Sequence, residues 1–367
     1  MPNNEINEAK NKPSPKPKTK SATGAPQRPK TNKKNSYLCP RMTKIRDIDL
    51  GDFPLLLAPM EDVSDPPFRV LCKEQGADMM YTEFISVEGL IRDAVKSKIK
   101  LDFAEAERPI GIQIFGAELT SMIRATEIIE EIKPDVLDIN FGCPVKKVTS
   151  KMMGAGILRD IPLMIRLAEA IVKTSSLPVT VKTRLGWDES NKPIVEVAEM
   201  LQDVGIAAIS IHGRTRKQMY KGEADWSLIA KVKENPRMHI PVFGNGDINT
   251  PQKAVEYKNK YGVDGIMIGR ASIGNPWIFR DIKHFQKTGE ILPPPTIHER
   301  VDAAKRLLQM ATQWKGERLG ILETRRHYTN YFKGYAGIKE FRHRLVTEDN
   351  LQALYQILEE IRQAYSI

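Results

Sequence analysis

The sequence predicts an α/β fold: a parallel (β/α)8 TIM barrel followed by a C-terminal helical bundle. Eight short apolar runs alternate with helix-length segments, which is the pattern of a repeated βα unit. The chain has 367 residues, more than the roughly 250 of one barrel, so one small additional domain fits. A doubly wound open sheet gives a similar pattern and is the alternative fold.

Each apolar run ends at a glycine, a proline or a polar residue. Such nearly continuous hydrophobicity is typical of parallel strands covered on both faces. The predicted strands are residues 53–58, 79–85, 110–115, 136–139, 179–182, 207–211, 240–243 and 265–268. Apolar residues at helical spacing predict helices between them, for example at 162–173 and 194–202.

Composition sets the domain boundaries. Residues 1–44 are rich in Lys, Pro, Asn and Ser, and they predict a disordered basic tail because they cannot bury enough apolar surface. The barrel is expected at 45–290. After a proline-rich linker at 291–295, three helical patterns predict a small helical domain at 291–367.

The positive charge lies mostly in the tail. Residues 1–46 contain 12 Lys or Arg and 2 acids, a surplus of 10 that equals the net charge of the whole chain. The tail is either attracted to a polyanion or a solvated spacer. The rest of the chain is neutral in sum, so RNA binding by the folded part has to rest on local clusters.

No apolar run approaches the ~18 residues of a membrane span, and the N-terminus lacks the apolar stretch of an export signal. The three cysteines, Cys39, Cys72 and Cys143, suit a reducing compartment. We therefore expect a soluble, cytoplasmic protein without membrane contact. The sequence implies no metal site and no protein partner.

Candidate site residues follow the predicted strands, because active sites of such barrels lie at the C-terminal strand ends. They are Ala58-Pro59-Met60, Gln113, Asn140-Phe141-Gly142-Cys143-Pro144, Lys182-Thr183-Arg184, His212-Gly213-Arg214-Thr215-Arg216, Gly244-Asn245-Gly246-Asp247 and Gly269-Arg270. The last two turns predict a phosphate site, since glycine backbone N–H groups and an arginine can surround its oxygens. Glycine at such turns is also ordinary turn chemistry.

Lys182 and Cys143 indicate redox chemistry. A lysine at the end of an apolar strand can stabilise the anion that a reduced flavin ring develops, although it can also extend to solvent. Gln113, Asn140 and His212 are neighbouring strand-end donors. A thiol at Cys143 can protonate one carbon of a double bond while hydride reaches the other. Cys72, inside an apparent helix, is interpreted as a buried apolar residue.

The helical domain carries a local basic cluster. Residues 325–344 hold one acid, Glu340, and the positively charged or titratable residues Arg325, Arg326, His327, Lys333, Lys339, Arg342, His343 and Arg344. Aromatic residues are interleaved: Tyr328, Tyr331, Phe332, Tyr335 and Phe341. The basic residues predict contacts with RNA phosphates, whereas most of the aromatic residues are expected in the core.

With these motifs in order, residues 53–345 resemble the tRNA dihydrouridine synthases, most of all the bacterial B-type branch. The motifs are those at the strand ends, together with Asp65-Pro66-Pro67-Phe68-Arg69, Leu185-Gly186 and Gln218. The resemblance implies an FMN-bound barrel that reduces the C5–C6 bond of particular uridines in tRNA, with NADPH restoring the flavin.

The same resemblance implies residue roles. Cys143 would protonate C5 of the uracil. Cofactor contacts would come from Ala58, Pro59, Met60, Gln113, Lys182, His212, Asn245, Gly246, Asp247, Gly269 and Arg270. The flipped-out uracil would face Asn140, Arg184 and Gln218. The helical domain would grip the tRNA through residues such as Arg325, Arg326 and Lys333.

Two features depart from the family pattern. Glu61 and Asp62 stand where small residues are usual, and the basic tail has no counterpart. Two alternatives remain open at this point. One is a flavin barrel that acts on a free small molecule, as dihydroorotate dehydrogenases do; the other is an RNA-binding protein that has lost catalysis.

Overall fold

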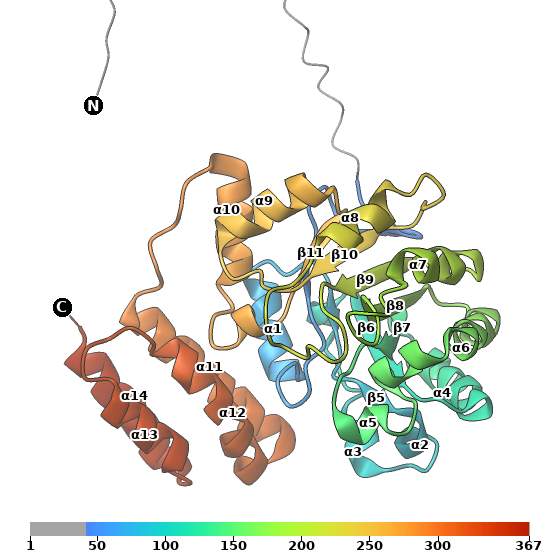
Figure 1. The fold of residues 1–367 in the computed structure, drawn as a ribbon. Helices are drawn as coiled ribbons and strands as arrows, with labels where there is room; N and C mark the ends of the chain where they lie inside the picture. Colours follow the sequence, from blue (N-terminus) through green and yellow to red (C-terminus); the bar gives the residue numbers. More distant parts are fainter. Residues whose placement is uncertain (1–41, 367) are drawn as a thin grey trace, which may run out of the picture. The chain divides into compact units, whose positions relative to one another are not determined.

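The computed structural model describes residues 42–366, in which eight parallel strands form a barrel surrounded by helices (Figure 1). The strand order is β3-β11-β10-β9-β8-β7-β6-β4, and the parallel bridge between Leu56 and Met79 joins the two ends. The sheet therefore closes, so the barrel prediction is confirmed and the open-sheet alternative is wrong. The barrel strands are β3 (Leu55–Leu57), β4 (Met80–Tyr81), β6 (Ile110–Phe115), β7 (Val136–Phe141), β8 (Val179–Arg184), β9 (Ala208–His212), β10 (Val242–Asn245) and β11 (Gly265–Ile268), and β5 (Ile85–Ser86) pairs with the end of β6.

Every predicted strand run overlaps one barrel strand. β7, β8 and β10 each extend two residues beyond the predicted end, so Asn140, Arg184 and Asn245 are strand residues. β10 begins at Val242 rather than Ile240, and Pro241 between them lacks the N–H that a strand ladder needs. These polar side chains are therefore positioned by ladder hydrogen bonds rather than by loops.

Helices alternate with the strands and bury one apolar face against them. In α6, for example, Asp160 caps the N-terminus by accepting a hydrogen bond from the Leu163 N–H, and Leu167 and Ile171 are fully buried. The barrel helices are α1 (Pro66–Glu74), α2 (Val87–Leu90), α3 (Val95–Ile99), α4 (Leu119–Ile132), α5 (Lys146–Thr149), α6 (Ile161–Thr174), α7 (Ile194–Asp203), α8 (Ser227–Glu234), α9 (Pro251–Tyr261) and α10 (Ile278–Thr288), with 3-10 turns η1 (Glu105–Glu107), η2 (Gly154–Arg159) and η3 (Arg270–Ser272).

A hairpin that the sequence did not predict closes the barrel end opposite the candidate site. Its strands are β1 (Lys44–Ile45) and β2 (Ile48–Asp49). Ile45 is fully buried in a cluster inside the barrel, and the Arg46 guanidinium donates to the Ser176 carbonyl, which precedes β8. Residues 42–44 thus belong to the folded part. Residues 1–41, with the rest of the predicted tail and Cys39, lie outside the described residues.

The C-terminal region forms four helices rather than the three patterns predicted. They are α11 (Ile297–Lys315), α12 (Glu317–Tyr331), α13 (Lys339–Thr347) and α14 (Leu351–Ala364). Gly334 and Gly337, both at positive φ, lie between α12 and α13 and interrupt the middle pattern. Tyr328, Tyr331 and Phe332 are fully buried, as expected for core aromatics. Within residues 42–366, no helix has the length and apolar character that a membrane crossing needs.

Candidate active site

A cavity of about 880 Å³ opens at the C-terminal ends of the barrel strands. This volume lies within the range of small-molecule and cofactor sites. Thirteen of the residues to which the family resemblance assigns roles line it: Ala58, Pro59, Met60, Asn140, Cys143, Lys182, Arg184, His212, Asn245, Gly246, Asp247, Gly269 and Arg270. The strand-end rule therefore brings together residues that are far apart in the sequence.

Cys143 lies in the loop after β7, and Asn140 fixes that loop. The N–H groups of Gly142 and Cys143 both donate to Asn140 Oδ1, over 3.0 and 2.8 Å. A Cβ at Gly154 would lie 2.9 Å from the Cys143 carbonyl oxygen, so only glycine fits there. Cys143 is 7% exposed, and burial raises the pKa of its thiol. The thiol therefore keeps its proton at neutral pH.

A buried polar chain lies beneath Asn140. Asn140 Nδ2 donates to Gln113 Oε1 over 2.7 Å, and Gln113 Nε2 donates to Asp138 Oδ2 over 2.5 Å. Burial raises the pKa of Asp138 to about 6. Gln113 is fully buried and is not among the residues that line the cavity. Its amide group is thus already used within the protein, and its predicted contact with the flavin ring gains no support here.

Lys182 projects from β8, where it pairs in register with Asn140 on β7. Its ammonium group forms no hydrogen bond or ion pair within the described residues 42–366. Burial, reinforced by Arg184, lowers the pKa of Lys182 to about 8. The Lys182 side chain is half-buried, and an ammonium group that is largely removed from water without a partner is costly unless a ligand supplies negative charge or acceptors. The lysine therefore fits a cofactor that carries an anionic ring or phosphate.

Arg184 connects the loops around the cavity mouth. Its Nε donates to the Gly142 carbonyl over 2.7 Å, and its Nη1 donates to the carbonyls of Thr215 and Met219 over 3.0 and 2.9 Å. Burial lowers the pKa of Arg184 to about 10, so it stays charged at neutral pH. Arg184 thus holds the Cys143 loop against the loop after β9.

His212 ends β9 and is neutral. Burial and the nearby cations, Arg184 first and then Lys182, lower its pKa well below the ordinary value. A neutral imidazole can donate from one ring nitrogen and accept at the other. His212 can therefore orient a ligand by hydrogen bonding, without adding charge.

The turn after β10 requires a glycine and is held together by a carboxylate. Gly246 has φ +126°, and a Cβ there would lie 2.7 Å from the Ala224 side chain. The Asp247 carboxylate accepts from Arg214 over 2.9 and 2.7 Å, from the Ala224 N–H over 2.8 Å and from Arg270 over 3.3 Å. Asp247 thus holds the arginines of two loops in place, while the Asn245 side chain donates to the Met267 carbonyl over 2.8 Å.

Tyr220 is a site residue that the sequence analysis missed. It lines the cavity and is 51% exposed. The guanidinium carbons of Arg270 and Arg184 lie 4.7 and 5.7 Å from its ring centroid. Gln218, two residues earlier, instead accepts a hydrogen bond from the Thr215 N–H over 2.7 Å and does not line the cavity. An aromatic residue so close to the 212–216 motif was the available signal for Tyr220.

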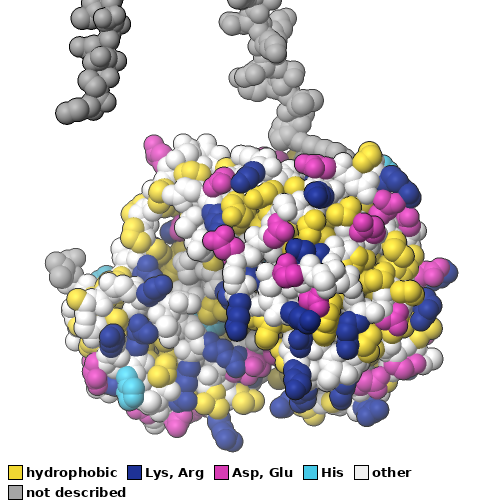
Figure 2. Space-filling view, viewed as in Figure 1, with side chains coloured by type: hydrophobic (Ala, Val, Ile, Leu, Met, Phe, Trp, Pro, Cys, Tyr) yellow, Lys and Arg dark blue, Asp and Glu magenta, His cyan; other side chains and the backbone are white. Residues whose placement is uncertain are grey.

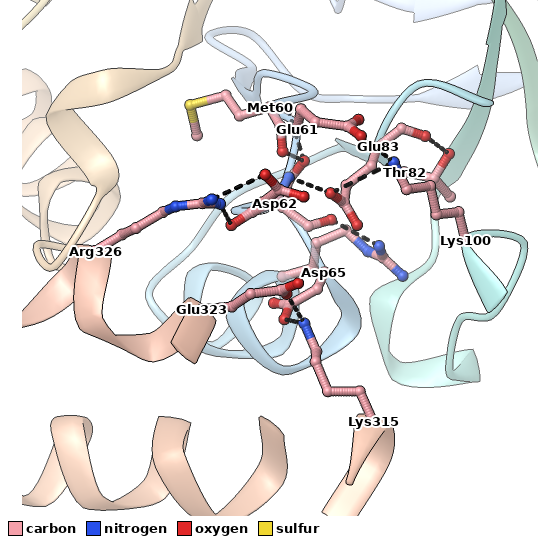
Figure 3. Close-up of polar contacts among 12 residues, drawn as sticks. Met60, Glu61, Asp62, Asp65, Thr82, Glu83, Lys100, Lys315, Glu323 and Arg326 are labelled. Carbon is pink, nitrogen blue, oxygen red and sulfur yellow. Dashed lines mark hydrogen bonds and ion pairs between the residues drawn. The ribbon is translucent and has the colours of Figure 1, made fainter. Parts of the chain in front are cut away.

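The loop after β3 carries the two unexpected acids (Figure 3). Glu61 forms an ion pair with Lys100 over 2.6 Å, and Asp62 forms an ion pair with Arg326 of α12. The Asp62 N–H donates to Glu83, a buried carboxyl whose pKa burial raises to about 7. Both acids are thus paired with cations beside the cavity.

The predicted RNA contacts of the helical domain differ in their surroundings. Arg325 pairs with Asp349 over 2.6 Å, and Arg326 pairs with Asp62 over 2.9 Å. Lys333 is exposed, and no carboxylate within residues 42–366 forms an ion pair with it. The structure therefore groups these residues on one domain but gives internal partners to two of the three.

The fold resembles solved barrels of other enzymes. Histamine dehydrogenase from Rhizobium sp. 4-9 matches with a TM-score of 0.53 at 12% identity, over 74% of this chain and 50% of that one. The chain thus spans about half the length of that protein. A morphinone reductase variant matches with a TM-score of 0.50 at 10% identity, over 71% of this chain and 93% of that one. These similarities define the class of fold, a (β/α)8 barrel.

The family follows from the sequence itself. Residues 56–366 match the dihydrouridine synthase family. The tRNA-dihydrouridine synthase B of Pseudomonas aeruginosa is 39% identical over 288 residues, covering 78% of this chain and 86% of that protein. A probable tRNA-dihydrouridine synthase of Rickettsia bellii is 37% identical over 302 residues, covering 82% and 92%. The chain therefore belongs to the dihydrouridine synthase family, and the resemblance drawn from its motifs is confirmed.

Proposed function

We propose that this protein is an FMN-dependent enzyme that reduces the C5–C6 double bond of particular uridines in tRNA, with NADPH restoring the reduced flavin. The observation that carries the proposal is that Cys143 and Lys182 line one cavity at the C-terminal strand ends. The names of the relatives support tRNA as the substrate. Bound FMN would supply hydride from its N5 to C6 of the uracil.

Cys143 would supply the proton. A general acid has to hold its proton until the reaction, and the raised pKa of the thiol meets that requirement. Hydride to C6 and a proton to C5 together add two hydrogens across the double bond, and no group leaves. Asn140 would position the thiol, because its carboxamide oxygen holds the loop that carries Cys143.

The cationic side chains would hold the cofactor. Lys182 would face the ring region that gains negative charge on reduction, and neutral His212 would hydrogen-bond beside it. Backbone N–H groups around Gly246 and Gly269, with the Arg270 guanidinium, would bind the phosphate. Ala58, Pro59, Met60 and Asn245 would form the remaining wall.

The uracil has to leave its stack to reach this cavity. Arg184 and Tyr220 stand at the mouth, and they would contact the extruded base by hydrogen bonding and stacking. Arg325, Arg326 and Lys333 stay predicted contacts to the tRNA, and α11 to α14 stay the predicted tRNA-binding domain.

The direct test is reoxidation of the NADPH-reduced, FMN-loaded protein by unmodified tRNA, with dihydrouridine measured by mass spectrometry of the nucleosides. We expect reoxidation by tRNA and none by orotate. Reoxidation by orotate alone would favour the free small-molecule reaction. A purified protein that stays colourless after FMN is added would favour an RNA-binding protein without catalysis.

A further inference from the structure

The helix α5 begins two residues after Pro144 and carries exposed lysines at the edge of the cavity. Cys143, Pro144 and Val145 line the cavity, and α5 continues directly from them. Lys146 and Lys147 on α5 and Lys151, two residues after its end, are exposed. Within residues 42–366, their ammonium groups form no hydrogen bond and no ion pair. The segment that follows Cys143 in the chain thus presents three positive charges without a counterion in the described chain.

Two arginines hold the C-terminal end of α5 by hydrogen bonds to Thr149. Arg159 Nη2 donates to the Thr149 carbonyl, and Arg216 Nη2 donates to Thr149 Oγ1, both over 3.0 Å. Both guanidinium groups lie over the Trp187 ring, with the carbon 4.6 and 4.9 Å from its centroid. Neither arginine forms an ion pair with a carboxylate of the described chain, and the buried Arg216 Nε has no partner there. The support of α5 is therefore also positively charged.

This arrangement differs in part from that of the helical domain. There, Arg325, Arg326 and Arg344 are each paired with an acid, whereas the exposed Lys333 and Lys339 form no ion pair within residues 42–366. Figure 2 shows Lys and Arg side chains gathered over the part of the barrel where Figure 1 places α3 and α5. Like charges without counterions repel one another, and a bound polyanion removes that repulsion. The charge pattern thus favours a phosphate-rich ligand at the barrel rim.

The position of Lys146, Lys147 and Lys151 beside the cavity matches the path that an RNA strand would take. A nucleotide that is extruded about its backbone leaves its own phosphate and the neighbouring phosphates at the surface beside the opening. Cys143 lies inside that opening, and α5 lies at its edge. Lysine suits this role, because it acts as a point charge that tolerates variation in phosphate position.

We propose that Lys146, Lys147 and Lys151 form a phosphate-binding rim that holds the RNA backbone next to the extruded uridine. The inference rests on the proposed function and adds to it a barrel-side contact, separate from the helical domain. Because the rim follows the Cys143 loop without interruption, binding of the backbone there fixes the strand relative to the thiol.

The test compares two triple variants of the FMN-loaded protein. The rim variant is Lys146→Ala/Lys147→Ala/Lys151→Ala. The matched control is Lys231→Ala/Lys260→Ala/Lys287→Ala, whose lysines are exposed near the C-terminal ends of α8, α9 and α10. Those helices run back toward the opposite end of the barrel, so the control removes the same charge away from the cavity.

Affinity for an unmodified tRNA transcript is measured by fluorescence anisotropy over a range of salt concentrations. For the rim variant we expect at least about a tenfold loss of affinity and a slope of log K against log salt that is shallower by about 2–3, since each lost phosphate contact removes about 0.7–0.9. FMN content and NADPH-driven flavin reduction should stay unchanged. The charge-preserving variant Lys146→Arg/Lys147→Arg/Lys151→Arg should restore both affinity and slope.

An unchanged affinity and salt slope in the rim variant would overturn the proposal, and so would an equal loss in the control. Dihydrouridine formation by the unaltered protein is measured in the same preparation. If that activity is absent, the proposed function fails; if it is present while the rim variant binds tRNA normally, only the rim fails.

Discussion

Arg326 on α12 donates two hydrogen bonds to Asp62, one from Nη1 to the backbone carbonyl over 2.5 Å and one from Nη2 to the carboxylate over 2.9 Å (Figure 3). Asp62 has φ +54° and lies in the loop whose Met60 and Glu61 line the cavity. The helical domain therefore holds the loop that forms one wall of the cavity. Lys315 makes a second, more buried connection, to Asp65 over 2.6 Å.

We predict that Asp62→Ala and Arg326→Ala have the same effect, a several-fold weaker affinity for FMN, because either change releases the loop. Fluorescence titration of the apoprotein with FMN measures this. If Arg326 instead binds tRNA phosphate, Arg326→Ala would weaken tRNA binding with FMN affinity unchanged, and Asp62→Ala would strengthen tRNA binding by freeing the arginine. The pair of variants thus separates a positioning role from an RNA contact.

Replacing Cys143 by alanine removes the proposed acid and little else. We expect Cys143→Ala to bind FMN and tRNA normally and to form dihydrouridine about 10²- to 10⁴-fold more slowly in single turnover, the usual contribution of a general acid. Cys72→Ala is the thiol control, because Cys72 is fully buried in α1. A rate in Cys143→Ala equal to that of the unaltered protein would show that another group gives the proton.

The pKa of Lys182 predicts that FMN binding depends on pH. In the protein without FMN, burial lowers this pKa to about 8, so the lysine is charged below pH 8 and neutral above it. An anionic ligand favours the charged form and raises the pKa, so binding takes up a proton above pH 8. FMN affinity should therefore fall from about pH 8 upward, by at most about tenfold per pH unit.

Lys182→Met provides the control for that titration. It should bind FMN more weakly below pH 8, and its affinity should change little between about pH 7 and 9, because the titrating group is gone. The flavin absorbance of this variant should also shift. A titration curve shared by the variant and the unaltered protein would assign the pH dependence to another group.

Asp247 should contribute to stability through Arg214, whose side chain is 2% exposed. Asp247→Asn leaves that guanidinium buried without its carboxylate, and we expect the free energy of unfolding to fall by about 2–4 kcal/mol in denaturant titrations. Glu105→Gln, at an exposed ion pair with Arg108, should change it by less than about 1 kcal/mol. A loss as small as that of the control would mean that solvent compensates Arg214.

The lowered pKa of Asp247 also determines how the free energy of unfolding depends on pH. Partial burial opposes ionisation of Asp247, but the hydrogen bond from Arg214 prevails and lowers its pKa. The stabilisation is therefore complete above the unfolded-state pKa of about 4 and is lost as the pH falls below it. Asp247→Asn should show a flatter dependence of unfolding free energy on pH in that acidic range.

The barrel and most of the site could be predicted because both follow from local pattern. Eight apolar runs define the strands, and parallel strands place the residues at their ends around one opening. Cys143 and Lys182 could be assigned to the same cavity for this reason alone. The sequence gives the position of each residue along its strand, and the barrel fold places the residues at the strand ends around one opening.

What could not be predicted depends on side-chain partners. Gln113 lies within β6 and Asp247 follows β10, and the amide of one and the carboxylate of the other are used inside the protein. Arg326 and Asp62 are 264 positions apart, and no local pattern links them. The hairpin at residues 44–49 was missed because its strands are two residues long and follow a stretch with the composition of a disordered tail.

That hairpin has a consequence for how the two substrates reach the cavity. Ile45 and Leu50 fill the end of the barrel opposite the cavity, so within residues 42–366 we expect ligands to reach the proposed flavin from the C-terminal strand ends. The electron donor and the uridine of tRNA would then use the same opening of the cavity, so their binding would be mutually exclusive. Initial-rate plots against both substrates should accordingly give parallel lines, the pattern of a double-displacement cycle.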